Sequence, residues 1–105
     1  MIHASAYAAT MTKKPDRIED LPEFQANEHL IGQAIHMGDA SRKYGIPHPT
    51  LSRWAKKGFI PVLGKDGQKT LLDEGYVAYC ATVYKNNPGQ GKRIFDKDGF
   101  PYYLN

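Results

Sequence analysis

Apolar residues recur at helical spacing in three segments in the centre of the chain, residues 38–44, 48–57 and 73–87. In the second segment, Leu51, Trp54 and Ala55 fall at i, i+3 and i+4, so they share one face of a helix. We expect this face to pack on the first segment and Trp54 to be a core residue. In the third segment, the same spacing over residues 76–84 predicts a helix that closes the core.

Glycine and proline mark the ends of these segments. Gly45 follows the first segment and Gly58 the second, and glycine tolerates the left-handed conformation in which helices often end. The two prolines in residues 47–49 suit the first turn of a helix, where a backbone N–H has no intrahelical acceptor. Asp39 and Asp73 are expected to cap the first and third helices. Two short helices joined by a tight, glycine-containing turn form a helix-turn-helix.

The region after the second helix predicts a β-hairpin. Apolar runs at residues 59–63 and 68–72 flank the turn sequence Gly-Lys-Asp-Gly at 64–67. Residues 34–37, before the first helix, are expected to be a short extended segment. A second hairpin is predicted near the C-terminus, over residues 93–103.

The chain divides into three parts on these patterns. Residues 1–22 are expected to be a disordered arm, 23–87 the folded domain and 88–105 a C-terminal hairpin or tail. The predicted fold class is mainly α with small β-hairpins. Within the domain, residues 23–33 predict one short amphipathic turn that packs through Phe24, Leu30 and Ile31. The aromatic residues of the tail either bind a partner or a second copy, or fold back over the third helix: Phe95, Phe100, Tyr102 and Tyr103.

Positive charge is concentrated in the middle of the chain. The net charge of the whole chain is +3, but residues 37–70 hold seven Lys and Arg against two Asp. Such a field attracts polyanions and speeds their encounter with the protein, although a basic surface can also be merely solvated. The charge pattern alone is therefore equally compatible with a nucleic-acid partner and with a solvated basic surface.

Several function classes are disfavoured. No apolar run approaches the roughly 18–20 residues needed to span a bilayer, and the N-terminus lacks the features of a secretory signal. The single cysteine, Cys80, fits a reducing compartment, so we expect a cytoplasmic protein of prokaryotic or phage origin. No phosphate loop, nucleophile elbow or catalytic carboxylate pair is recognisable, which predicts a protein that is not an enzyme and needs no cofactor. The spacing of the candidate metal ligands matches no paired zinc pattern: His3, His29, His36, His48 and Cys80.

The order of these parts resembles the winged helix-turn-helix shared by MerR-type regulators and by phage or transposon excisionases. The similarity runs from Ile35 to about Tyr84, and is carried by residues 39–46, 50–54, 57–61, 72–74 and 77–79. In those families the second helix lies in the DNA major groove and the hairpin, or wing, reaches the backbone or minor groove. The resemblance implies the same roles for residues 48–57 and for the hairpin here.

The sequence also departs from the family pattern. Pro47 stands where Ser or Thr is usual, and Ser52 and Arg53 stand where many MerR regulators carry Arg and Tyr. We expect no room after Asn87 for the coiled coil and effector domain of a full MerR regulator. This favours the small, stand-alone branch of excisionase-like proteins and regulators.

The expected DNA contacts come from three places. Residues of the second helix are expected to contact base edges or phosphates: His48, Thr50, Ser52, Arg53 and Lys56. Arg42 and Lys43 of the first helix are expected to bind phosphates, and Lys65, Gln68 and Lys69 to make wing contacts. Each set also has a simpler interpretation as solvated surface.

The leading prediction is a sequence-specific protein that binds double-stranded DNA, either an excisionase-like recombination directionality factor or a small transcriptional regulator. It would act without a small-molecule substrate or membrane, with self-association or an integrase or polymerase as further partners. The alternative is a protein-interaction adaptor, antitoxin-like or serving phage assembly or packaging, that uses the helix-turn-helix as a scaffold.

Overall fold

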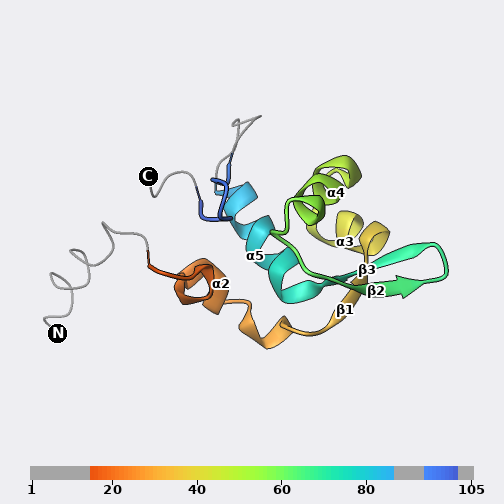
Figure 1. Ribbon diagram of the computed structural model, residues 1–105, viewed down its shortest axis with the longest axis horizontal. Coiled ribbons are helices and arrows are strands. Elements are labelled where there is room, and N and C mark those ends of the chain that lie inside the picture. The colour runs from red at the N-terminus through yellow and green to blue at the C-terminus, as the bar shows by residue number, and fades with distance from the viewer. Residues whose placement is uncertain (1–14, 87–93, 102–105) are drawn as a thin grey trace, which may run out of the picture.

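The computed structural model describes residues 15–86 and 94–101 and shows a small mixed α/β domain (Figure 1). The described residues form four α-helices, two single-turn 3-10 helices and one antiparallel sheet of three strands. The elements in chain order are Ile18–Asp20 (3-10), α2 Pro22–Gln25, Glu28–Leu30 (3-10), β1 Ala34–His36, α3 Met37–Tyr44, α4 His48–Lys56, β2 Val62–Asp66, β3 Lys69–Asp73 and α5 Glu74–Lys85.

The expectation of a mainly α fold is corrected by the sheet. Strand β1, which was expected to be only a short extended segment, pairs antiparallel with β3, while β3 also pairs with β2. The strand order is therefore β1-β3-β2, with β3 in the centre. Ile35, Leu72 and Val62 stand side by side across the three strands, and Leu72 is fully buried where the sheet meets the helices.

The predicted hairpin is present, but its turn is shorter than expected. Strand β2 continues through Asp66, so Gly67 and Gln68 alone connect it to β3, with Gly67 at a φ of 66°. A two-residue turn of this kind matches the twist of the strands when its first residue has a positive φ. Gly64 lies inside β2 at a bulge, where Leu63 is an extra residue between the pairs Val62–Leu72 and Gly64–Leu71.

Helices α3 and α4 are joined as the glycine and proline pattern predicts. Gly45 adopts the left-handed conformation, with a φ of 67°, and the hydroxyl of Ser41 donates to the Ile46 carbonyl at 2.6 Å. The prediction that Asp39 caps α3 is wrong. Because β1 leads directly into the helix, α3 begins at Met37 with His36 as its N-cap, and no side chain makes a cap hydrogen bond.

Helix α5 runs through the centre of the domain and is buried along most of its length (Figure 1). Asp73 caps it as predicted, accepting a hydrogen bond from the Gly75 N–H at 3.0 Å. Cys80 is fully buried in this helix, and the burial raises the pKa of its thiol above the ordinary value. A thiol that is buried and kept neutral in this way is a poor nucleophile.

The prediction that Trp54 belongs to the core is confirmed. Its ring packs edge-on against Tyr84 of α5 and against Phe95, with centroid distances of 5.8 and 5.3 Å. Phe95 and Phe100 are themselves buried, so the described part of the tail folds back over α4 and α5. The chain reverses between these two residues and forms a bridge from Phe95 to Pro101, while Tyr102 and Tyr103 lie outside the described residues.

Residues 15–33 pack on the opposite flank of α5. Leu21, which falls in the predicted arm, is buried, and Phe24 stacks edge-on with Tyr76 at 4.8 Å; residues 1–14 of that arm lie outside the described part. Gly75 permits a very close approach here, because a Cβ at this position would lie 2.8 Å from the Ile31 Cα. Among the described residues, none of the helices combines the length and apolarity that a membrane crossing requires.

Candidate nucleic-acid interface

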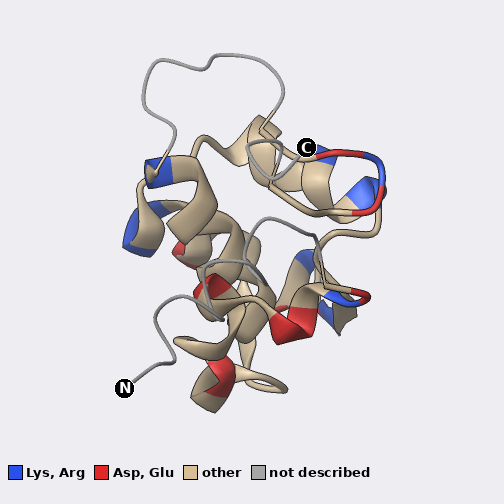
Figure 2. Ribbon diagram, turned by 90° about the vertical axis from the view of Figure 1, so that its left-hand side faces the viewer, with Lys and Arg blue, Asp and Glu red and all other residues tan. Residues whose placement is uncertain are grey.

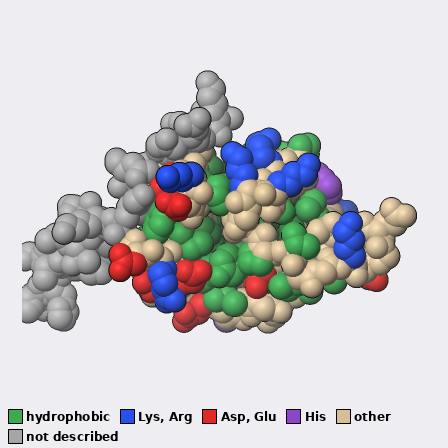
Figure 3. Space-filling model, viewed as in Figure 1, with side chains coloured by type: hydrophobic (Ala, Val, Ile, Leu, Met, Phe, Trp, Pro, Cys, Tyr) green, Lys and Arg blue, Asp and Glu red, His purple; other side chains and the backbone are tan. Residues whose placement is uncertain are grey.

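Helix α4 separates its apolar and basic residues on opposite faces. Leu51 and Trp54 point into the core, whereas His48, Arg53 and Lys56 are exposed. Thr50 and Ser52 are half-buried along the edge between the two faces. Figure 3 shows the basic side chains gathered over α4 and a further one on the hairpin.

Lys57, which was not among the predicted contacts, extends the basic surface of α4. It is exposed and directly follows the last residue of the helix. The pair Lys56-Lys57 in front of Gly58 was a sequence signal for it, because a helix C-terminus favours cations that reach outward from the final turn. The exposed basic residues of this region are Arg53, Lys56 and Lys57 from α4 and Lys65 and Lys69 from the hairpin, and we call this set the basic face.

The basic face is electrostatically unsatisfied. Across residues 15–86 and 94–101, no carboxylate lies within 4 Å of any of its five cationic groups, and none of them takes part in a side-chain hydrogen bond. Lysine and arginine side chains without internal partners keep their full positive field toward solvent. They are therefore available to an anionic ligand without first breaking an internal ion pair.

The two cations predicted on α3 are placed differently. Arg42 pairs with Asp39 one turn earlier, and Lys43 pairs with Glu74 at the start of α5. The Tyr44 hydroxyl also donates to Glu74, at 2.6 Å. Both cations remain more than half exposed, yet each already faces a carboxylate of the same chain.

Glu74 is the buried centre of this cluster, with only 7% of its surface exposed. Burial by itself raises the pKa of its carboxyl, but the hydrogen bonds from Lys43 and Tyr44 outweigh burial, so the pKa is lowered. The same contact has the opposite effect on its partner: burial and then the bond to Glu74 raise the pKa of the Tyr44 hydroxyl. Lys43 thus holds α3 against α5 through an ionised carboxylate.

The hairpin presents its polar residues on two faces. Lys65 pairs with Thr70 in the strand register and Asp66 pairs with Lys69. Because side chains alternate along a strand, Lys65 and Lys69 project from opposite faces of the hairpin. Gln68 lies in the turn between them and is exposed.

Acidic residues gather at the other end of the molecule. Figure 2, drawn from the end that carries α2, shows acidic segments in the lower half of the view, and Figure 3 shows them on the α2 side, away from the basic face. They belong to residues 16–28, which hold five Asp and Glu and only one Arg. The domain therefore has a marked charge asymmetry along its length.

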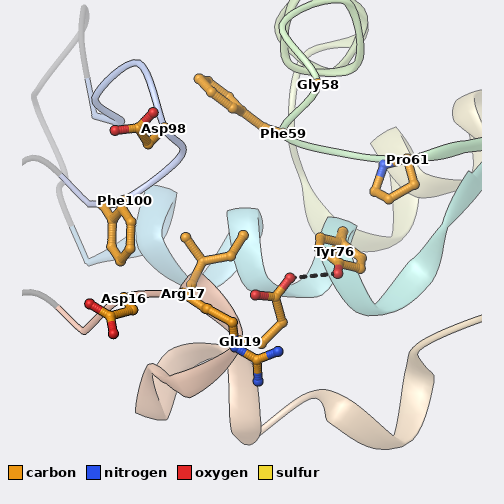
Figure 4. A pocket seen from close by; sticks show the side chains of 10 residues that line it. Asp16, Arg17, Glu19, Gly58, Phe59, Pro61, Tyr76, Asp98 and Phe100 are labelled. Carbon is orange, nitrogen blue, oxygen red and sulfur yellow. Dashed lines mark hydrogen bonds between the residues drawn. The ribbon is translucent and has the colours of Figure 1, made fainter.

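An open hollow of about 530 Å³ lies between residues 15–19, the segment after α4 and the loop of residues 98–100 (Figure 4). Its lining combines three aromatic rings with three carboxylates: Phe59, Tyr76, Phe100, Asp16, Glu19 and Asp98. The Tyr76 hydroxyl donates to Glu19 at 2.9 Å, and burial together with this bond raises the pKa of Tyr76 to about 12. Because its rim is acidic, the hollow disfavours the binding of phosphate. The basic face is the more favourable surface for a polyanion.

The predicted contact residues therefore fall into two groups. Within the described residues, the cations predicted on α4 and on the two faces of the hairpin have no carboxylate partner, whereas those of α3 are engaged with Asp39 and Glu74. Among the described residues, no group of three or more His, Cys, Asp and Glu side chains is arranged to hold a metal ion. Comparison of the chain with known protein families, with curated proteins and with solved structures finds no match.

Proposed function

We propose that this protein binds double-stranded DNA through a winged helix-turn-helix, with α4 as the recognition helix and the β2–β3 hairpin as the wing. The observation that carries the proposal is the basic face, whose five exposed cations, on or next to α4 and on the hairpin, have no carboxylate partner within residues 15–86 and 94–101. A short helix that presents Arg and Lys outward fits the B-DNA major groove, which is about 12 Å wide.

The proposal divides the work among the basic residues. Arg53 and Lys56, on the outer face of α4, contact base edges or phosphates, while Lys65 and Lys69 fix the hairpin on the backbone. Thr50 and Ser52, at the two edges of the outer face, and the exposed His48 supply further hydrogen-bonding groups. The biological role we propose is an excisionase-like recombination directionality factor or a small transcriptional regulator.

The alternative, a protein-interaction adaptor that works through its aromatic tail, has less support. Phe95 and Phe100 are buried in the chain's own core, where the ring of Phe95 contacts Trp54, Phe59 and Tyr79. Aromatic side chains used in this way are unavailable to a partner.

A mobility shift with a mixed pool of duplex DNA, repeated over a series of salt concentrations, tests the proposal. Arg53→Ala and Lys69→Ala are each expected to weaken binding by about 1–3 kcal/mol and to flatten the dependence of affinity on salt, because each removes a phosphate or base contact. Arg17→Ala is the matched control, since Arg17 is also exposed but lies at the acidic end and pairs with Asp20. If all three variants bind like the wild type, the basic face is not a DNA interface.

A further inference from the structure

His36 lies between two carboxylates at the junction of β1 and α3. Its Nε2 is 2.9 Å from Oδ2 of Asp66, at the end of β2, and its Nδ1 is 3.4 Å from Oδ2 of Asp39, in the first turn of α3. Asp66 directly precedes the turn of the hairpin. The ring of His36 thus joins the tip of the hairpin to the beginning of the helix-turn-helix.

This contact is the main side-chain tie of the hairpin tip. Strand β1 pairs with β3 only over residues 71–73, so residues 64–70 project beyond the edge of β1. Within the described ranges, no other side-chain hydrogen bond or ion pair reaches residues 62–69. The orientation of the tip relative to α3 and α4 therefore depends on the sheet ladder and on His36.

The arrangement suits the protonated form of the ring. An ionised carboxylate only accepts hydrogen bonds, and a neutral imidazole has one donor and one acceptor nitrogen. Only the imidazolium can donate to Asp39 and Asp66 at once. The other charges on this side are Arg42, which pairs with Asp39, and Lys69, which stands opposite Asp66 in the ladder.

We propose that His36 is a positioning residue for DNA binding: its contact with Asp66 holds the hairpin at a fixed angle to α4, and the contact is strongest when the ring is protonated. The inference rests on the proposed function of the basic face. By holding Asp66, His36 also compensates a negative charge that lies between Lys65 and the turn, next to the surface that DNA approaches. An imidazolium donates to an ionised carboxylate more strongly than a neutral ring does, so the effect of His36 on DNA affinity depends on the charge of the ring.

The test compares wild type, His36→Ala, Asp66→Ala and the double variant in DNA affinity at several pH values. At the lowest pH of the series, His36→Ala is expected to bind up to about fivefold more weakly than wild type, as for one partly exposed ion pair. The ratio of the two affinities falls toward one as the pH rises. Every other titratable group is present in both proteins, so its effect on affinity cancels in that ratio. In the Asp66→Ala background, His36→Ala has no further effect.

Hydrogen exchange in the free protein tests whether the His36–Asp66 contact holds the hairpin, independently of any effect on DNA binding. Amides near the Gly67–Gln68 turn are expected to exchange severalfold faster in His36→Ala than in wild type, whereas His29→Ala, a change of another exposed histidine, leaves them unchanged. A ratio of affinities that is independent of pH, or an undiminished effect of His36→Ala without Asp66, would overturn the inference. A different outcome would overturn the proposed function instead. In that outcome the wild type fails to bind DNA, although the hairpin amides still exchange faster in His36→Ala than in wild type, and the role of His36 in binding falls with the proposed function.

Discussion

Helices α3 and α4 are neighbours of almost equal length, and each carries two cations in its last turn: Arg42 and Lys43 on α3, Arg53 and Lys56 on α4. Their surroundings differ. The fold brings a carboxylate to each cation of α3, one from the same helix and one from α5, but none to those of α4 within the described residues. A similar pair of cations in the last turn thus yields one helix whose cations are paired within the protein and one whose cations face solvent.

The largest effect is expected on the inner face of α4. Trp54→Ala removes a buried ring that touches Tyr84 and Phe95, and should lower the free energy of unfolding by about 3–5 kcal/mol. Chemical denaturation measures the loss, and Trp54→Phe, which keeps an aromatic ring, should lose less. By contrast, Arg53→Ala at the adjacent position should leave stability nearly unchanged, so equal losses at the two positions would contradict the division of α4 into two faces.

A smaller effect is expected where α3 meets α5. Glu74→Gln should lower the free energy of unfolding by about 1–2 kcal/mol at neutral pH, because the buried carboxylate that accepts from Lys43 and Tyr44 loses its charge. Since the pKa of Glu74 is lowered in the folded protein, its contribution is complete above the ordinary carboxyl value of 4.5 and is lost as the pH falls through the folded value.

Denaturation over a pH series detects that difference. The wild type should lose more stability than Glu74→Gln as the pH drops below about 5, because only the wild type has this carboxyl to protonate. DNA affinity at neutral pH should not decrease in the variant, since Lys43 is released rather than removed. Parallel pH profiles of the two proteins would show that Glu74 does not stabilise the contact between α3 and α5.

The smallest effect is expected for the exposed pair on α3. Arg42→Ala breaks a surface ion pair with Asp39, which contributes about 0.2–1 kcal/mol at most to stability. Its DNA affinity should fall by less than that of Arg53→Ala in the same salt series, because Arg42 already faces a carboxylate. If Arg42→Ala lowered DNA affinity as much as Arg53→Ala does, α3 would contribute to the interface as strongly as α4.

Short-range signals in the sequence predicted most of the local structure. Gly45 ends α3, the proline-rich start precedes α4, and Asp73 caps α5, each through contacts within a few residues. The apolar spacing that placed Trp54 in the core is equally local. These features depend on the conformational preferences of single residues and on helical periodicity, so they can be predicted from a few neighbouring positions in the sequence.

Contacts between distant segments were the part that sequence reasoning missed. Strand β1 has only three residues, too few for an alternating pattern, and it becomes a strand because β3 lies beside it. Likewise, the bond between Lys43 and Glu74 spans 31 positions and that between His36 and Asp66 spans 30. Neighbouring residues in the sequence do not show that Lys43 is paired with a carboxylate and that Lys56 is not. Only the fold shows which of the predicted site residues face a carboxylate of the same chain.

The bulge at Leu63 affects how copies of this protein behave in concentrated solution. Strand β2 is an edge of the described sheet and carries the exposed apolar residues Val62 and Leu63. An unprotected edge of this kind invites strand pairing between molecules and hence aggregation. The bulge breaks the regular row of N–H and C=O groups next to these two residues, and leaves only residues 64–66 in regular register with β3 before the turn. A stretch that short is a poor template for another strand, so the bulge disfavours pairing between copies of the chain along the exposed edge of β2.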